Sequence, residues 1–285
     1  MRKGIVVFLV LGVLVGCYRT WIEVTEEVQA PNWTSDNKVI FLLERIEWYH
    51  EEAPPVFSGY VEPRRATLIL MQCNADGSGM ESLGVVYDVP EKDYTSLSLG
   101  LSSAGDWVVV SVKQEIWVIR RDGTGLQKVG SGINPDFSPD ASQIVYEKPD
   151  SGIWIMDRDG SNNHCIVPDP DAKYPAWSPD DTLVAYGWVT HIVNLKDNSI
   201  KEYPHMGFLD WGPKGSGAFL AWYDIHPVIV DLKGNVRDTL ISELNGAVFW
   251  SPDGQYFIGL NGSWWVCKKD GTNKWYINSK IKGGE

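Results

Sequence analysis

The residue types that most often carry catalysis are thinly spread along this chain of 285 residues. No Gly-x-Ser-x-Gly motif is present, so the nucleophile of a typical hydrolase is missing. Asp157–Ser161 resembles a calcium loop, but its glycine falls two positions early and a hairpin turn explains the segment better. The five histidines are scattered without metal-ligand spacing: His50, His164, His191, His205 and His226. These patterns predict no catalytic residue, no metal and no cofactor.

A recurring pair of turns must position whatever site the chain has. A Ser-Pro-Asp-like turn is followed about twenty residues later by a second turn, usually Asp-Gly, with a period of 34 to 40 residues. Four short apolar strands surround these turns in each repeat, as at Ile144–Tyr146 and Ile153–Met156. Six such repeats predict an all-β fold, a six-bladed β-propeller of four-stranded antiparallel blades. The first turns begin at Trp33, Leu101, Phe137, Trp177, Trp211 and Trp250.

The composition agrees with one strand-rich domain. Fourteen Trp and twelve Tyr favour strands over helices. The repeat is interrupted once by an insertion, but it runs without a break in composition from about residue 28 to residue 285. The net charge of −12 and the lack of a Lys/Arg stripe argue against a nucleic-acid partner. Tryptophans recur at two equivalent positions of the repeats and are expected between blades, as core, rather than as sugar-stacking platforms. The first position holds Trp33, Trp177, Trp211 and Trp250, and the second holds Trp117, Trp154 and Trp265.

The repeats resemble the WD-repeat-like blades of TolB-type β-propellers. The resemblance rests on the Ser-Pro-Asp-Gly turn and on the Ile-Trp-Val strand that ends in Asp-Gly, and it is closest at 137–161 and 250–272. TolB has an additional N-terminal α/β domain, for which the repeats leave no room here. The resemblance implies a propeller that binds a protein or envelope component, and within the TolB family one such partner is the peptidoglycan-associated lipoprotein.

The N-terminus has the pattern of a secretory signal. Two basic residues precede an apolar run of about thirteen residues, too short to span a bilayer. Leu14-Val15-Gly16-Cys17 resembles the lipobox of bacterial lipoproteins, which implies cleavage before Cys17 and acylation of that residue. We therefore predict a signal peptide at 1–16, a tether at 17–27 and the propeller at 28–285, exported and lipid-anchored to the cell membrane or outer membrane. Cys73, Cys165 and Cys267 are expected to be free, buried thiols.

Alternation along the innermost strand of each blade predicts which residues line the channel. The residue before each repeated aromatic position is expected to face the channel; these residues are Asn32, Gly100, Asp136, Ala176, Asp210 and Phe249. Two positions earlier lie Ala30, Ser98, Asn134, Tyr174, Phe208 and Ala247. Asn134, Asp136, Tyr174 and Asp210 are the candidate ligands of this mildly acidic channel. It could bind a cation or an amine, or it could be a water-filled structural channel.

An insertion in the first blade, at 46–66, is the second candidate site. Its aromatic and arginine residues suit a protein interface, and they include Trp48, Tyr49, His50, Tyr60, Arg64 and Arg65. A hairpin that packs on its own blade is an equally good interpretation. We expect a monomeric, non-enzymatic binding lipoprotein. The alternatives are a hydrolase or lyase acting on a small or carbohydrate substrate in the channel, and a purely structural repeat protein.

Overall fold

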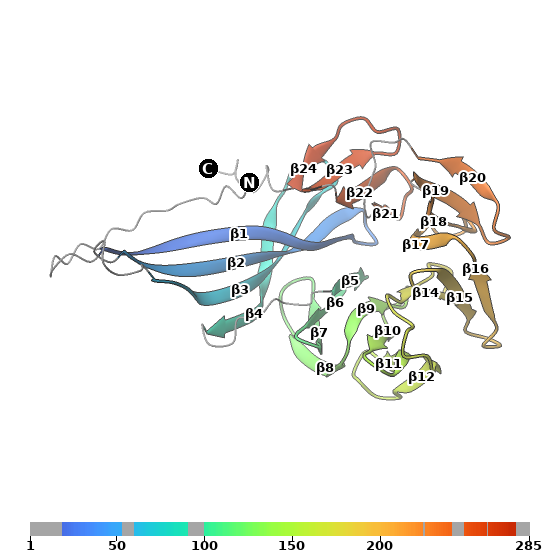
Figure 1. Cartoon of the computed structure of the whole chain (residues 1–285), viewed down its shortest axis with the longest axis horizontal. Helices are drawn as coiled ribbons and strands as arrows, with labels where there is room; N and C mark the ends of the chain where they lie inside the picture. Colours follow the sequence, from blue (N-terminus) through green and yellow to red (C-terminus); the bar gives the residue numbers. More distant parts are fainter. Residues whose placement is uncertain are drawn as a thin grey trace.

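The computed structural model describes residues 19–52, 60–90, 100–224, 226–240, 248–260 and 262–277. The expected signal peptide and Cys17 lie outside the described residues. The chain forms six four-stranded antiparallel sheets, which confirms the predicted all-β propeller. Figure 1 shows the sheets in chain order around a common centre. No helix in the described ranges is long and apolar enough to cross a membrane.

Each sheet consists of four strands that are consecutive in the sequence. Blade one contains β1 (Arg19–Trp33), β2 (Lys38–Glu52), β3 (Tyr60–Asn74) and β4 (Glu81–Pro90). Blade two contains β5 (Gly100–Ala104), β6 (Trp107–Val112), β7 (Glu115–Arg120) and β8 (Gln127–Ser131). Blade three contains β9 (Ile133–Phe137), β10 (Gln143–Lys148), β11 (Gly152–Asp157) and β12 (His164–Val167).

The other three blades follow the same order. Blade four contains β13 (Ala176–Trp177), β14 (Leu183–Tyr186), β15 (Thr190–Asn194) and β16 (Ile200–Tyr203). Blade five contains β17 (Met206–Trp211), β18 (Ala218–Tyr223), β19 (His226–Asp231) and β20 (Val236–Thr239). Blade six contains β21 (Val248–Trp250), β22 (Tyr256–Leu260), β23 (Trp264–Lys268) and β24 (Trp275–Tyr276).

The repeated turns are stabilised by their own polar side chains. In blade three the Ser138 hydroxyl donates to Asp140 at 2.7 Å and accepts the Gln143 N–H at 2.9 Å, which joins β9 to β10. The Asp-Gly turn of the same blade places Gly160 at φ +88°, a conformation that glycine adopts without steric cost. These local interactions explain why the two motifs recur with each blade.

The repeated tryptophans pack between blades, as predicted. Trp33, Trp177, Trp211 and Trp250 are all buried, and each belongs to one of the apolar clusters of the fold. The Trp211 indole N–H also donates to the Ala176 carbonyl of the preceding blade at 2.9 Å. The same side chains therefore supply apolar burial and direct contacts from blade to blade.

The ring closes between the first and last blades. The inner strands contact one another in the order β1, β5, β9, β13, β17 and β21, and β21 contacts β1. One apolar cluster contains Phe41 of blade one together with Val266 of blade six. Trp275 of blade six donates its indole N–H to the Ala75 carbonyl of blade one at 2.9 Å. Side-chain packing thus closes the ring, with every blade built from its own stretch of chain.

Blade two departs from the predicted register. Ser103 pairs with Val108, five positions on, whereas Phe137 of blade three pairs with Ile144, seven positions on. The turn of blade two is therefore two residues shorter, and Ser103 rather than Leu101 occupies the repeated aromatic position. By this register Ser102, rather than Gly100, is the residue of blade two level with Asp136. Gly100 lies two positions earlier on the same face of β5, and its place in the channel stays a prediction.

Blade one extends beyond the ring as an arm, formed by residues 19–27, 44–52, 60–68 and 87–90. Arg19 pairs with Glu52, and Glu51 pairs with Tyr60, so the strands continue far past those of the other blades. Figure 1 shows β1, β2 and β3 running out of the ring to the left. Most of the expected tether lies in the arm, because β1 begins at Arg19. The described residues of the predicted insertion, 46–52 and 60–66, lie in this arm.

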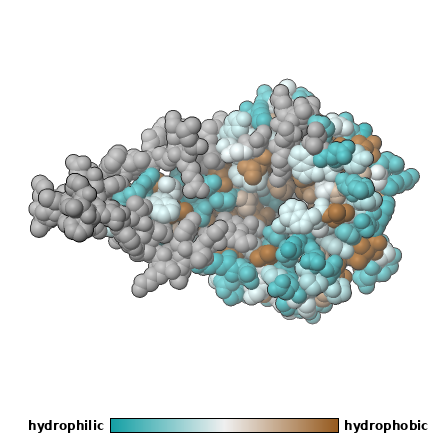
Figure 2. Space-filling model, in the orientation of Figure 1, coloured by the Kyte–Doolittle hydropathy of each residue, from teal (hydrophilic) through white to brown (hydrophobic). Residues whose placement is uncertain are grey.

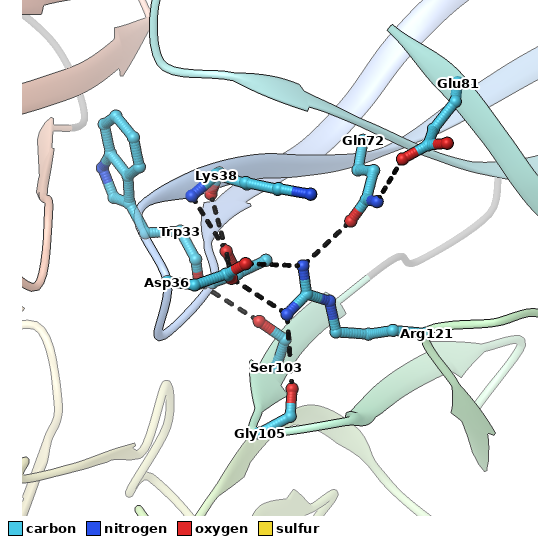
Figure 3. Close-up of polar contacts among 9 residues, drawn as sticks. Trp33, Asp36, Lys38, Gln72, Glu81, Ser103, Gly105 and Arg121 are labelled. Atoms are coloured by element: carbon cyan, nitrogen blue, oxygen red, sulfur yellow. Dashed lines mark hydrogen bonds and ion pairs between the residues drawn. The ribbon is translucent and has the colours of Figure 1, made fainter. Parts of the chain in front are cut away.

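A partly buried arginine joins blade one to blade two. Arg121 follows β7 and donates to Asp36 at 2.9 Å and to the Gln72 side chain at 3.0 Å, both in blade one. Gln72 in turn donates to Glu81 at 2.5 Å. Figure 3 shows this cluster at the junction of the two blades. Burial acts to raise the pKa of Asp36, but hydrogen bonds from Thr34 and Arg121 hold that pKa below its ordinary value.

The three described cysteines are free, as expected, but only two of them are buried. Cys73 and Cys267 are buried, and Cys165 is half-buried. Burial raises the pKa of the Cys267 thiol to about 11, so this side chain behaves as a small apolar group at neutral pH.

The visible face of the molecule mixes hydrophilic and hydrophobic residues, with hydrophilic ones predominating (Figure 2).

Candidate functional site

The topology divides the propeller into two faces. Every sheet is a meander, so the first-to-second and third-to-fourth strand turns lie at one end of the blade. The second-to-third turns and the links between blades lie at the opposite end. We call this second surface the loop face. Tyr174 comes from the link between blades three and four, and Asn134 is the second residue of β9, next to the link that precedes it, so both lie near the loop face.

Asp136 joins three consecutive blades. It lies on β9, and its carboxylate accepts the backbone N–H of Trp177 in blade four at 2.7 Å and the Ser102 hydroxyl of blade two. Sequence reasoning missed the contribution of Ser102 because the register of blade two was shifted. Asp136 is therefore part of the contact between inner strands.

Asp210 has the same role two blades further on. One carboxylate oxygen accepts the N–H of Trp211 in its own strand at 2.8 Å, and the other accepts the N–H of Trp250 in blade six at 2.6 Å. Asn32 repeats the arrangement in blade one. Its side-chain oxygen accepts the Trp33 N–H at 2.7 Å, and its amide donates to the Leu101 carbonyl of blade two at 3.0 Å. The residue before the aromatic position thus fastens one inner strand to the next.

The two carboxyls have a strong tendency to hold a proton. Burial raises the pKa of Asp136, although hydrogen bonds from Ser102 and from the Trp177 and Phe137 N–H groups oppose the shift. Burial also raises the pKa of Asp210 to about 8, against two backbone hydrogen bonds, and repulsion from Asp136 adds to the increase. At neutral pH Asp210 therefore favours its protonated, uncharged form.

These contacts bear on the predicted channel ligands. Asp136 and Asp210 have their oxygens committed to neighbouring blades, which favours a structural role over a catalytic one. No group of three His, Cys, Asp or Glu side chains in the described ranges is arranged to hold a metal ion. Within the part of the chain that the structure describes, the residues best placed to meet a ligand lie nearer the loop face.

Asn134 and Tyr174 meet around a buried glutamate. Glu147 of β10 is 5% exposed, and one of its oxygens accepts the Asn134 amide at 2.9 Å and the Tyr174 N–H at 3.2 Å. Asn134 and Tyr174 both have left-handed backbone, at φ 50° and 55°. For tyrosine this conformation carries strain, of the kind that often occurs at binding sites. The structure thus unites two of the predicted residues with a third that the sequence did not reveal.

An exposed aromatic pair lies next to this glutamate. Trp188, in the turn between β14 and β15, is 74% exposed, and Tyr174 is 46% exposed. Their rings meet edge to face with centroids 5.0 Å apart. Sequence reasoning missed Trp188, although it stands outside the two repeated tryptophan positions and so lacked a core explanation. We call Asn134, Glu147, Tyr174 and Trp188 together the Glu147 site.

The side chains of the predicted insertion largely contact their own blade. The Trp48 indole donates to Thr25 at 2.8 Å, and His50 lies 2.8 Å from Glu23, both across β1 and β2. Arg65 forms an ion pair with Asp88 across β3 and β4. Tyr49 is half-buried, and the side chains of Tyr60 and Arg64 lie outside the described part of the chain. These contacts match the packed-hairpin interpretation, and partner binding by the insertion stays a prediction.

Comparisons with known proteins agree with a propeller. The sequence matches no protein-family model and no curated protein. A chain of a mitotic checkpoint complex is similar in structure, with a TM-score of 0.50 and 11% identity over 91% of this chain and 96% of that chain. An oligogalacturonate lyase from Vibrio parahaemolyticus gives a TM-score of 0.48 and 12% identity over 90% and 95%. An identity of 11% with the checkpoint-complex chain shows a similarity of fold alone, and the six four-stranded sheets define the protein as a six-bladed β-propeller.

Proposed function

We propose that this protein is a lipid-anchored envelope lipoprotein with a TolB-like propeller that binds a protein ligand on its loop face, without catalysis. The exposed Trp188 beside Tyr174 is the observation that carries the proposal. Tryptophan and tyrosine dominate the binding energy of protein interfaces, so an exposed, adjacent pair of them suits a contact with a protein.

The arm supports the anchoring half of the proposal. Cys17 lies two residues before the start of β1 at Arg19, and Arg19 pairs with Glu52 near the end of β2. An acyl group on Cys17 would therefore attach the molecule at the far end of the arm. Nine residues of extended strand, from 19 to 27, span about 30 Å at about 3.3 Å per residue. The arm would hold the ring away from the lipid surface by a distance of that order.

The anchor is tested with Cys17→Ser in the native host. The wild-type protein should incorporate radiolabelled palmitate and sediment with membranes, and the variant should do neither. Membrane association of Cys17→Ser without palmitate would contradict the proposed lipoprotein.

Binding on the loop face is tested by cross-linking and co-purification of the full-length protein after gentle detergent extraction. Trp188→Ala should lose most of a partner that the wild type captures. Tyr276→Ala is the matched control, because Tyr276 is 44% exposed but lies on the outermost strand of blade six. Equal capture by all three proteins would exclude the loop-face aromatics as the binding surface.

A further inference from the structure

The inference begins with the charge of Glu147. A carboxylate that is 5% exposed normally pairs with a cation, since an isolated buried charge is unfavourable. The partners of Glu147 are two neutral donors, the Asn134 amide and the Tyr174 N–H. Among the described residues no lysine, arginine or histidine forms an ion pair with it. The neighbouring Lys148 is directed elsewhere, with its ammonium 4.1 Å from the centre of the Trp154 ring.

The aromatic pair supplies a second means of holding a cation. The face of a tryptophan or tyrosine ring attracts ammonium and guanidinium groups within about 6 Å of its centre. Trp188 and Tyr174 are exposed, and Tyr174 is fixed to Glu147 through its own N–H. A ligand that reaches the rings is thus close to the buried carboxylate as well.

We infer that the Glu147 site, between blades three and four, binds a lysine or arginine side chain of the partner protein. Glu147 provides the counter-charge, and the rings of Trp188 and Tyr174 contact the cation and its aliphatic stem. The inference rests on the proposed function for its claim that the occupant belongs to a protein. The charge preference itself is a property of this chain and can be measured without the partner.

The test uses full-length protein in detergent micelles and small-molecule probes. N-acetyl-lysine amide and N-acetyl-arginine amide are titrated by ligand-observed NMR, with N-acetyl-norleucine amide as the uncharged control. At least one charged probe should bind about tenfold more tightly than norleucine amide, a ratio within the range of a cation–π contact joined to a carboxylate. Equal binding of all three probes, or no saturable binding of either charged probe, would overturn the inference.

Two variants locate the binding. Glu147→Gln removes the charge but keeps an oxygen that can accept both N–H groups, and it should abolish the preference for charged probes. Trp188→Ala should weaken the charged probes by about twofold to fivefold, the effect of an exposed cation–π contact. If Glu147→Gln does not fold, Trp188→Lys serves instead, because a resident ammonium should exclude the charged probes. Variants that fold and retain the wild-type preference would refute the assignment.

The outcome is separable from that of the proposed function. Partner capture that depends on Trp188, without any preference for charged probes, would leave the proposed function intact and refute this inference. A clear preference for charged probes without a captured partner would support the site and count against the proposed protein ligand.

Discussion

Replacing Asp210 with asparagine should change how the stability of the protein depends on pH. Asp210 holds blade five to blade six, because its two oxygens accept the N–H groups of Trp211 and Trp250. Asparagine can still accept one N–H, as Asn32 accepts that of Trp33 at 2.7 Å. Its amide nitrogen, however, would face the Trp250 N–H as a second donor. One buried hydrogen bond is therefore lost at every pH.

The magnitude follows from the pKa of Asp210. It is about 8 in the folded protein, against an ordinary value of 3.8, so the folded state binds a proton that the unfolded chain has already released. Between pH 4 and 8 the free energy of unfolding of the wild type therefore falls, by at most about 1.4 kcal/mol for each pH unit, through this residue. Turn carboxylates such as Asp140, whose hydrogen bonds lower the pKa, lose their contribution below 3.8, outside this window.

Asparagine does not titrate, so the free energy of unfolding of the variant does not fall with pH through this residue. At pH 5 we expect Asp210→Asn to be less stable than the wild type by about 1 to 3 kcal/mol, the effect of an unsatisfied buried donor. Towards pH 8 the difference should shrink or reverse, because only the wild type becomes less stable through this residue. Every other ionisable group is common to both proteins, so its contribution largely cancels in the comparison.

The assay is urea unfolding followed by tryptophan fluorescence at pH 5, 6, 7 and 8. Asp106→Asn, at an exposed position in a turn, is the control and should differ from the wild type by a constant amount. If the curves of Asp210→Asn and the wild type stay parallel from pH 5 to 8, Asp210 does not titrate there and the reasoning is wrong.

Arg121→Ala should lower the free energy of unfolding by about 1 to 3 kcal/mol in urea titrations, because it removes the Arg121 donor from the side-chain oxygen of the buried Gln72 in blade one; an unchanged midpoint would contradict a role for the arginine in joining the blades. Gly160→Ala should lower the free energy of unfolding more than Gly105→Ala does. An added methyl group at Gly160 overlaps the Val129 carbonyl, whereas at Gly105 there is open space and the only cost is that of alanine in left-handed backbone, about 1 to 2 kcal/mol. Equal melting temperatures of the two variants would refute this. Iodoacetamide at pH 8 should modify Cys165 long before Cys267 by peptide mass mapping, and rapid labelling of Cys267 in the folded protein would contradict its burial.

Local signals in the sequence predicted the fold well. The Ser-Pro-Asp and Asp-Gly turns use their own side chains and glycines, so their spacing revealed the blades directly. The register of blade two was harder, because its turn is shorter and Ser103 stands where the other blades have an aromatic residue. Turn length is a local detail, and apolar periodicity does not determine it.

The candidate site depended on contacts between distant residues. Asn134 and Tyr174 were predicted from strand alternation, but the glutamate between them comes from a different strand and lacked any motif. Asp136 and Asp210 were predicted as free channel charges, because a sequence does not show that the next blade presents an N–H to each of them. Such pairings arise only when the ring is assembled.

The seam of the ring has a consequence for biosynthesis. The apolar flank of blade one that carries Val28 and Phe41 is covered by Ile258 and Val266, which come from the last blade to be made. As the polypeptide emerges, the earlier blades can stack in order, but that flank stays in contact with water until synthesis is nearly complete. A chain truncated before residue 248 would retain five paired sheets, and the apolar flank of blade one would stay exposed to water. Such a fragment should aggregate, because residues 248–277 supply the apolar side chains that cover this flank.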